Sequence, residues 1–249
     1  MLTNDLNHSA IATNFKHRIV NNVYPGRGIV IGRNTAGQWV QVYWIMGRSD
    51  NSRNRILTMN NRVLQTQAAD PAKLKDPSLV IYNAMREINH CFLVTNGVQT
   101  DVIYQGIEED KTFEESLLTQ SHEPDAPNFT PRISGCLDLG QTAIRVKLSL
   151  IKASPFNSNF SEHHFFHYQT VEAGYGYALT TYRENGNPLP PFEGVPFVVL
   201  LEGNAQEIGN TYWEGLNEAN RISLAVKTID PYQKESALLL INKYPSKQD

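Results

Sequence analysis

The chain has 249 residues, of which 41% are hydrophobic and 19% charged, a composition that excludes disordered, collagen-like and disulfide-stapled proteins. Its formal net charge of -3 argues against a general nucleic-acid or membrane binder, because such proteins usually carry a basic face. No apolar run approaches the length that spans a bilayer, and the N-terminal segment lacks a signal-peptide pattern. We therefore expect a cytoplasmic protein with reduced cysteines.

The first predicted element is an N-terminal arm, residues 1–22, whose sequence has no periodicity that assigns a structure. A single domain, residues 23–249, follows and is predicted to begin with a hairpin. Residues 27–33 and 38–45 are rich in Val, Ile, Tyr and Trp, and the turn-like stretch 34–37 separates them.

A second hairpin is predicted at residues 91–95 and 98–104. The Asn-Gly pair at 96–97 between them supplies the positive φ angles of a tight turn. Thr112, followed three residues later by Glu115, is typical of a capping box, which predicts that a helix begins there.

Further strands are predicted at residues 143–151, 163–170, 175–183, 195–202, 221–229 and 237–241. Asn204 and Glu207 resemble a second helix cap, and apolar residues recur at four-residue spacing after them. Hairpins outnumber helices and do not alternate with them. We therefore predict an α+β fold of antiparallel sheets covered by helices.

The segment IMGRSDNSRNR, residues 45–55, is called the arginine loop. Guanidinium forks beside hydroxyl donors suit a phosphate group, and each charge-assisted hydrogen bond contributes roughly 1.5–3 kcal/mol. Because the loop leaves the end of a strand, we expect Arg48 and Arg53 to point into a shared cleft, whereas Arg55 and Arg62 face water. The alternative is a solvated surface turn.

Three histidines, His163, His164 and His167, indicate a metal site as one interpretation. On a strand they lie too far apart to share a metal without a bend, so an aromatic sheet surface explains them better. Cys91 and Cys136 lack a neighbouring base that would make either a nucleophile, and we expect buried, unreactive thiols.

Five segments, taken in order, resemble the archaeal-type IMP cyclohydrolases. They are YPGRGIVIGRNTAGQWVQVYWIMGRSDNSRNR, DPSLVIYNAMR, FLVTNGVQTDVI, the predicted helix at 112–121, and NFTPRISG. The resemblance implies a four-layer αββα sandwich of the N-terminal-nucleophile-hydrolase type. The chain opens with Met1-Leu2 where that type carries a Cys, Ser or Thr nucleophile, so the resemblance implies the scaffold with a different reaction.

The reaction that the resemblance implies is the dehydrative closure of formamidoimidazole-carboxamide ribotide (FAICAR) to inosine monophosphate in purine biosynthesis. It implies a small purine ribotide as the ligand, with no metal and no organic cofactor. An assembly of identical subunits is also compatible with the family. The alternatives are a ribotide-binding protein without cyclase activity and an amidohydrolase acting on C–N bonds.

The resemblance also assigns site residues. Arg48, Ser49 and Arg53 match the family's Arg-Ser loop and are assigned to the phosphate. Tyr82 is expected to donate to the oxyanion or transfer a proton, and Asn83 to orient the carboxamide. The full set is Tyr82, Asn83, Asp101 and Glu123 for catalysis, and Arg27, Arg48, Ser49, Arg53, Asn96, Gly97, Thr100 and Arg132 for substrate binding.

The stretch HEPDAPNFTPRI, residues 122–133, departs from the family. Archaeal members carry a Lys and a Glu before Thr-Pro-Arg-Ile that are proposed to take part in catalysis, and this chain does not reproduce them. Either His122, Glu123 or Asp125 takes over proton transfer, or the chain binds a ribotide without closing its ring.

Overall fold

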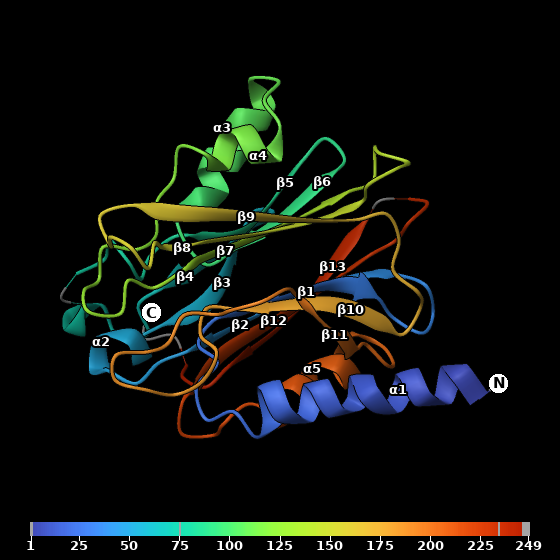
Figure 1. Cartoon of the computed structure of the whole chain (residues 1–249), viewed down its shortest axis with the longest axis horizontal. Helices are drawn as coiled ribbons and strands as arrows, with labels where there is room; N and C mark the ends of the chain where they lie inside the picture. The colour runs from blue at the N-terminus through green and yellow to red at the C-terminus, as the bar shows by residue number, and fades with distance from the viewer. Residues whose placement is uncertain (1, 75, 234, 246–249) are drawn as a thin grey trace.

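The computed structural model describes residues 2–74, 76–233 and 235–245. Figure 1 shows four layers: one helix pair, a seven-stranded sheet, a six-stranded sheet and a second helix pair. The outer helices are α3 (Gln99–Glu108) with α4 (Phe113–Leu117), and α1 (Leu2–Phe15) with α5 (Ala205–Gly215). The protein is therefore α+β, with two antiparallel sheets between helices.

The six-stranded sheet has the order β11-β10-β1-β2-β12-β13, with β1 (Gly28–Arg33), β2 (Trp39–Met46), β10 (Tyr175–Thr180), β11 (Phe197–Leu200), β12 (Arg221–Ile229) and β13 (Ser236–Asn242). The seven-stranded sheet runs in sequence order, with β3 (Ile56–Asn60), β4 (Val63–Gln67), β5 (Asn83–Ile88), β6 (Cys91–Thr95), β7 (Arg132–Asp138), β8 (Val146–Ala153) and β9 (Ser161–Tyr168). Two short helices, α2 (Asp50–Arg53) and the 3-10 turn Pro71–Lys73, lie in the connections.

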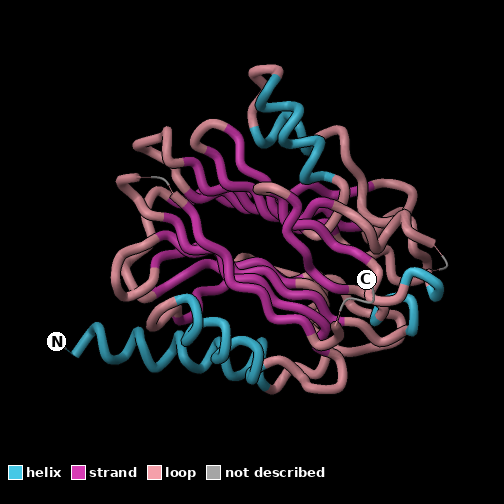
Figure 2. Tube along the Cα trace, turned by 180° about the vertical axis from the view of Figure 1, so that it is seen from behind, coloured by secondary structure: helices cyan, strands magenta, loops and turns pink. Residues whose placement is uncertain are grey.

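The main hydrophobic core lies between the two sheets. Figure 2 shows the two sheets from the side opposite to that of Figure 1. Strand β2 is buried along its whole length because the other sheet covers one of its faces and α5 the opposite one. On the α5 side, the Trp44 ring lies 6.1 Å from that of Tyr212. A smaller cluster, which includes Leu93 and Phe113, seats α3 and α4 on the seven-stranded sheet.

Several local predictions are confirmed. Strands β1 and β2 form the predicted first hairpin, and the predicted strands of the C-terminal half correspond to β8 to β13. Thr112 and Asn204 each accept from the backbone N–H three residues on, and Glu115 and Glu207 reach back to them as in a capping box. Predictions based on residues close together in the sequence therefore located these strands and helix starts correctly.

The predicted second hairpin is wrong. Strand β6 does begin at Cys91, but residues 99–108 form helix α3, and β6 pairs with β5 and β7. The Asn96 side chain explains the difference, because its Oδ1 accepts from Gln99 Nε2 at 2.9 Å and from Ile133 N at 2.9 Å. Asn96 thus ties the start of a helix to β7 instead of forming a tight turn.

The N-terminal segment, for which the sequence assigns no structure, is largely helical. Helix α1 leads into a π-helical turn over Lys16–Val20, and Ile19 is completely buried. The Phe15 ring meets that of Tyr212 edge-on at 5.0 Å, so this segment packs on α5.

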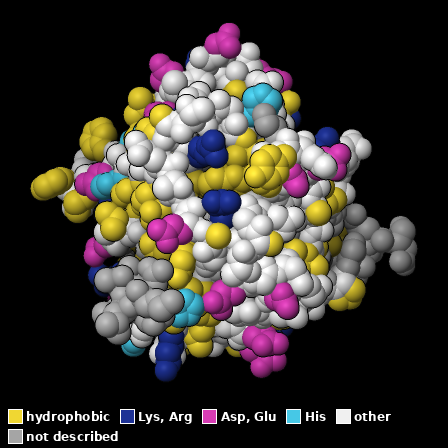
Figure 3. Space-filling view, turned by 90° about the vertical axis from the view of Figure 1, so that its right-hand side faces the viewer, with side chains coloured by type: hydrophobic (Ala, Val, Ile, Leu, Met, Phe, Trp, Pro, Cys, Tyr) yellow, Lys and Arg dark blue, Asp and Glu magenta, His cyan; other side chains and the backbone are white. Residues whose placement is uncertain are grey.

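Within the described residues, no helix has both the length and the apolarity needed to cross a bilayer. On the face shown in Figure 3, basic side chains lie singly among acidic, apolar and neutral ones. That face is therefore not a continuous basic surface.

An ion pair joins the two sheets through the core. Lys227 of β12 is only 2% exposed, and its Nζ lies 2.6 Å from Glu87 Oε1 of β5. Burial lowers the pKa of Lys227, while the carboxylate of Glu87 opposes that shift. Ser236 Oγ donates to the same Glu87 oxygen at 2.6 Å. The charge on Lys227 therefore depends on Glu87.

We predict that Glu87→Gln lowers the free energy of unfolding by roughly 3 kcal/mol, because it leaves a buried ammonium without its counter-charge. Lys227→Met should cost less, since it removes the buried charge itself. Urea unfolding followed by fluorescence measures both. The control is Glu109→Gln, which removes a carboxylate that pairs with Lys111 on the surface and should not shift the urea midpoint. Equal losses in Glu87→Gln and Lys227→Met would contradict the assignment.

Candidate active site

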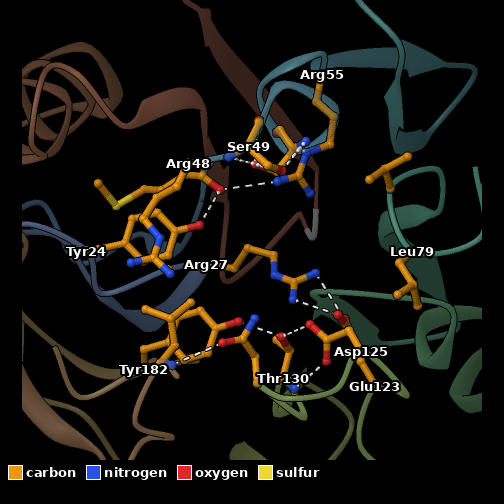
Figure 4. Close-up of a pocket in the computed structure, with 16 residues that line it drawn as sticks. Tyr24, Arg27, Arg48, Ser49, Arg55, Leu79, Glu123, Asp125, Thr130 and Tyr182 are labelled. Carbon is orange, nitrogen blue, oxygen red and sulfur yellow. Dashed lines mark hydrogen bonds and ion pairs between the residues drawn. The ribbon is translucent and has the colours of Figure 1, made fainter. Parts of the chain in front are cut away.

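A cavity of about 240 Å³ lies where the arginine loop, the start of β1 and the segment before β7 meet. Figure 4 shows side chains from these distant parts of the sequence directed toward one space. The lining residues are Tyr24, Gly26, Arg27, Met46, Arg48, Ser49, Ser52, Arg55, Leu79, Val80, Glu123, Asp125, Asn128, Thr130, Tyr182 and Leu189.

The centre of the cavity is a buried ion pair. Arg27 donates to Glu123 through Nη2 at 3.0 Å, and its Nη1 lies 3.0 Å from the other carboxylate oxygen. Arg27 Nη1 also donates to the Asn96 carbonyl at 3.1 Å. Burial lowers the pKa of Arg27, but Glu123 and the nearby Tyr82 outweigh it, so the pKa lies well above its usual value. A fixed positive charge therefore stands in the middle of the site.

A tyrosine pair lies near this guanidinium without lining the cavity. The Tyr43 and Tyr82 hydroxyl oxygens are 2.6 Å apart, and both side chains are buried. Burial, followed by the neighbouring Tyr82, raises the pKa of Tyr43 well above its usual value. The pair is therefore positioned to influence Arg27 rather than to contact a ligand in the cavity.

The arginine loop forms one side of the cavity with Arg48, Ser49, Ser52 and Arg55. Arg48 lies over the Tyr24 ring at 4.9 Å and donates to Asn185 Oδ1 at 2.7 Å. Ser49 caps α2 in a capping box with Ser52. This side offers guanidinium and hydroxyl donors with no carboxylate among its lining residues.

The prediction of which arginines point into the cleft and which face water is wrong in two respects. Arg55, expected to face water, is only 3% exposed, lines the cavity and donates to the Ser52 carbonyl at 2.8 Å. Arg53 does not share the cleft with Arg48, because its Nε is held by the Gly47 carbonyl at 3.1 Å and it lines a different hollow. Helix α2 ends at Arg53, whereas Arg55 lies beyond it, directly before β3, so the two side chains take different partners.

The opposite side of the cavity carries a chain of three hydrogen-bonded groups. Thr130 Oγ1 lies 2.5 Å from Asp125 Oδ2 and 2.5 Å from the Tyr182 hydroxyl, and Thr130 N donates to Asp125 Oδ1 at 2.6 Å. The Tyr182 ring stacks on that of Tyr24 with centroids 5.9 Å apart. Burial raises the pKa of Tyr182, although Arg27 opposes it, and the phenol stays protonated at neutral pH.

Asn83 and Asp101, both predicted catalytic residues, lie outside the cavity lining. Asn83 Nδ2 donates to the Asp101 carboxylate at 2.9 and 3.0 Å, and Arg86 donates to it at 2.7 Å. The Arg86 guanidinium in turn lies 3.4 Å from the centre of the Tyr104 ring. These groups join β5 to α3.

Contacts with other protein groups, outside the cavity lining, hold four of the predicted substrate-binding residues: Asn96, Gly97, Thr100 and Arg132. Thr100 is buried and shares a 2.6 Å hydrogen bond with Thr95. Arg132 donates to the Ser121 carbonyl at 2.8 Å, and a Cβ on Gly97 would come within 2.5 Å of Arg132 Nη1. None of the four lines the cavity.

The remaining candidates lie elsewhere. In the described part of the chain, no group of three or more His, Cys, Asp or Glu side chains is placed to hold a metal. His167 Nε2 instead lies 2.6 Å from a Glu114 oxygen. Cys91 and Cys136 are free thiols, and Cys136 is buried. His122, a candidate for proton transfer, bonds Ser161 Oγ through Nδ1 at 2.8 Å and does not line the cavity.

Sequence analysis identified Arg27, Arg48, Ser49 and Glu123 among the lining residues and named Asp125 as an alternative. It missed Tyr24, Arg55, Thr130 and Tyr182. A residue that completes a site from a distant segment, as Tyr182 does, has no local signal in the sequence.

Comparisons with known proteins agree with the resemblance. Residues 24–235 match a family described as IMP cyclohydrolase-like protein. A protein named IMP cyclohydrolase from Methanosphaera stadtmanae is 33% identical over 123 residues, 47% of this chain and 58% of that protein. One of the same name from Methanopyrus kandleri is 28% identical over 166 residues, 65% of this chain and 76% of its own. One from Methanococcus aeolicus is 26% identical over 120 residues, 47% of this chain and 59% of its own.

We predict that inorganic phosphate raises the melting temperature of the protein by binding the arginine side of the cavity in the folded state. Arg48→Ala should weaken that binding about tenfold or more, since one guanidinium contact contributes roughly 1.5–3 kcal/mol. Arg53→Ala is the matched control and should keep the full rise. Differential scanning fluorimetry across a phosphate series measures each variant against its own baseline. If Arg53→Ala loses the rise and Arg48→Ala keeps it, the anion binds in the other hollow.

Proposed function

Since the chain belongs to the IMP cyclohydrolase-like family, we propose that it closes the purine ring, converting formamidoimidazole-carboxamide ribotide to inosine monophosphate with loss of water. Three relatives that carry the name IMP cyclohydrolase support this proposal. The layer order of the fold supports a scaffold of the N-terminal-nucleophile-hydrolase type, on which this chain performs a different reaction.

The reaction sets three requirements. The carboxamide nitrogen attacks the formyl carbon of the same molecule, so the site must hold the formyl group in its attacking rotamer, and such positioning contributes several kcal/mol. The attack places negative charge on the formyl oxygen, which needs a fixed positive partner. That oxygen leaves as water after receiving two protons, one from the carboxamide nitrogen and one from the formamido nitrogen.

The single observation that carries the proposal is the distribution of charge in the cavity. Arg48 and Arg55 line one side, Glu123 and Asp125 line the other, and Arg27 stands between them. A ribotide has the matching polarity, with a dianionic phosphate at one end and a proton-donating carboxamide at the other. We assign the phosphate to the arginine side, where Ser49 and Ser52 add hydroxyl donors.

Arg27 is assigned to the formyl oxygen. Glu123 engages both of its terminal nitrogens from one side, which holds the guanidinium in a fixed position before substrate binds. A preorganised cation of this kind needs no rearrangement as charge develops on the substrate. Leu79, Val80 and Leu189 supply apolar surface around it and limit access of water.

We predict that the purified protein accelerates inosine monophosphate formation from the formyl ribotide above the spontaneous rate. Arg27→Lys should lower kcat about a hundredfold, because the point charge remains but the guanidinium fork that fixes its place is lost. Arg145→Lys is the control; Arg145 lies outside the cavity and should give wild-type kcat. Product is followed by its ultraviolet absorbance.

No acceleration by the wild type would contradict the catalytic proposal. Calorimetric binding of inosine monophosphate in that case would identify a ribotide-binding protein of the same family. Release of ammonia from an amide substrate would instead favour an amidohydrolase.

A further inference from the structure

The hydrogen-bonded chain Asp125–Thr130–Tyr182 is called here the relay, and Thr130 and Tyr182 have no role in the proposed function above. The relay joins residues from two distant parts of the sequence, and all three line the cavity. Its two oxygen-to-oxygen distances, Thr130 Oγ1 to Asp125 Oδ2 and Thr130 Oγ1 to the Tyr182 hydroxyl, are both 2.5 Å. Hydrogen bonds connected in series are suited to moving protons, because each group is already in place to give and receive one.

The donors and acceptors in the relay fix its direction. An ionised carboxylate only accepts hydrogen bonds, and Asp125 takes both the N–H and the hydroxyl of Thr130. Thr130 has a single hydroxyl proton, which is thereby used. The Tyr182 hydroxyl must then donate to Thr130 Oγ1. Its remaining lone pair is free to accept a proton from a ligand in the cavity.

Resting on the cyclohydrolase function, we infer that Tyr182, Thr130 and Asp125 form the general base of the reaction, with Tyr182 as the group that touches the carboxamide and Asp125 as the final proton acceptor. Asp125 is one of the three residues, with His122 and Glu123, that the sequence offers for proton transfer. Tyr182 is the catalytic residue because it touches the carboxamide, and Thr130 and Asp125 act through it.

The carboxamide N–H bond breaks as the nitrogen forms a bond to the formyl carbon, and the C=O electron pair moves onto the formyl oxygen. The nitrogen's proton passes to the Tyr182 oxygen while Tyr182 gives its own proton to Thr130 and Thr130 gives its own to Asp125. Asp125 ends neutral. It returns that proton along the same path to the formyl oxygen, which becomes a hydroxyl. The hydroxyl departs as water when it receives a second proton, the one lost by the formamido nitrogen.

The other two candidates fit this role less well. Glu123 has each carboxylate oxygen 3.0 Å from a nitrogen of Arg27, and accepting a proton would break that buried ion pair. His122 points to Ser161 and does not reach the cavity lining. Burial also raises the pKa of Tyr182, which favours a concerted transfer in which the phenol never carries a full negative charge.

The surrounding structure holds Tyr182 in place. Its ring stacks on Tyr24, and Gly26 presses against it with φ of 75°. A Cβ at Gly26 would come within 2.5 Å of Tyr182 Cδ2, so only glycine allows this approach. Such packing positions the hydroxyl without a further hydrogen bond.

The test uses four variants of the full chain: Asp125→Asn, Tyr182→Phe, Thr130→Val and Thr130→Ser. The first three should each lower kcat at least about a hundredfold, the usual contribution of a general base, while calorimetric affinity for inosine monophosphate stays near that of the wild type. Thr130→Ser keeps the hydroxyl and should retain kcat within a few-fold. Tyr168→Phe removes a phenol outside the cavity and should have wild-type kcat.

One further readout separates catalysis from structure. The double variant Asp125→Asn/Tyr182→Phe should be no slower than either single one, since the two act as a unit.

Three results would overturn the relay. They are wild-type kcat in Thr130→Val or Tyr182→Phe, a double variant Asp125→Asn/Tyr182→Phe that is much slower than either single variant, and equal losses of kcat in Thr130→Ser and Thr130→Val. An active wild type with any of these leaves the proposed function standing and removes the relay alone. A wild type without turnover overturns both.

Discussion

The Arg27–Glu123 ion pair is the interaction on which the candidate site depends. Arg27 precedes β1 of the six-stranded sheet, and Glu123 belongs to the segment that leads into β7 of the seven-stranded sheet. Their side chains are only 9% and 4% exposed, so neither charge has water to replace a lost partner. The pair therefore fixes one sheet against the other at the cavity and holds a cation there. Asn96, which accepts from Arg27 through its carbonyl, extends the same contact to the start of α3.

This constraint organises the two sides of the cavity around a central charge. The arginine loop can present further cations because Arg48 and Arg55 are satisfied by backbone carbonyls and an amide rather than by carboxylates. On the opposite side, Asp125 is available to accept a proton because Glu123, and not Asp125, neutralises Arg27. In the proposed reaction, Glu123 holds Arg27 in place and Asp125 accepts the proton. Each role follows from the hydrogen-bond partners of that carboxylate.

Local signals predicted much of the fold from the sequence. The hairpin of β1 and β2 and both capping boxes were predictable because the residues that form them are near neighbours. The segment after β6 was not, since Asn96 bonds Ile133 across the sheet and turns an apparent hairpin into a helix start. The site was predicted only in part for the same reason. Arg53 ends a short helix and Arg55 lies beyond it, while Tyr182 follows β10 and is brought to the cavity where that strand pairs with β1.

A crystal structure with inosine monophosphate bound would show how the ribotide lies between the two sides of opposite charge. We expect the phosphate within hydrogen-bond distance of the Arg48 and Arg55 guanidiniums and the purine ring beside Arg27 and the Tyr182 hydroxyl. A phosphate in the hollow of Arg53 and Lys73, or a ring turned toward Asn83 and Asp101, would contradict this expectation.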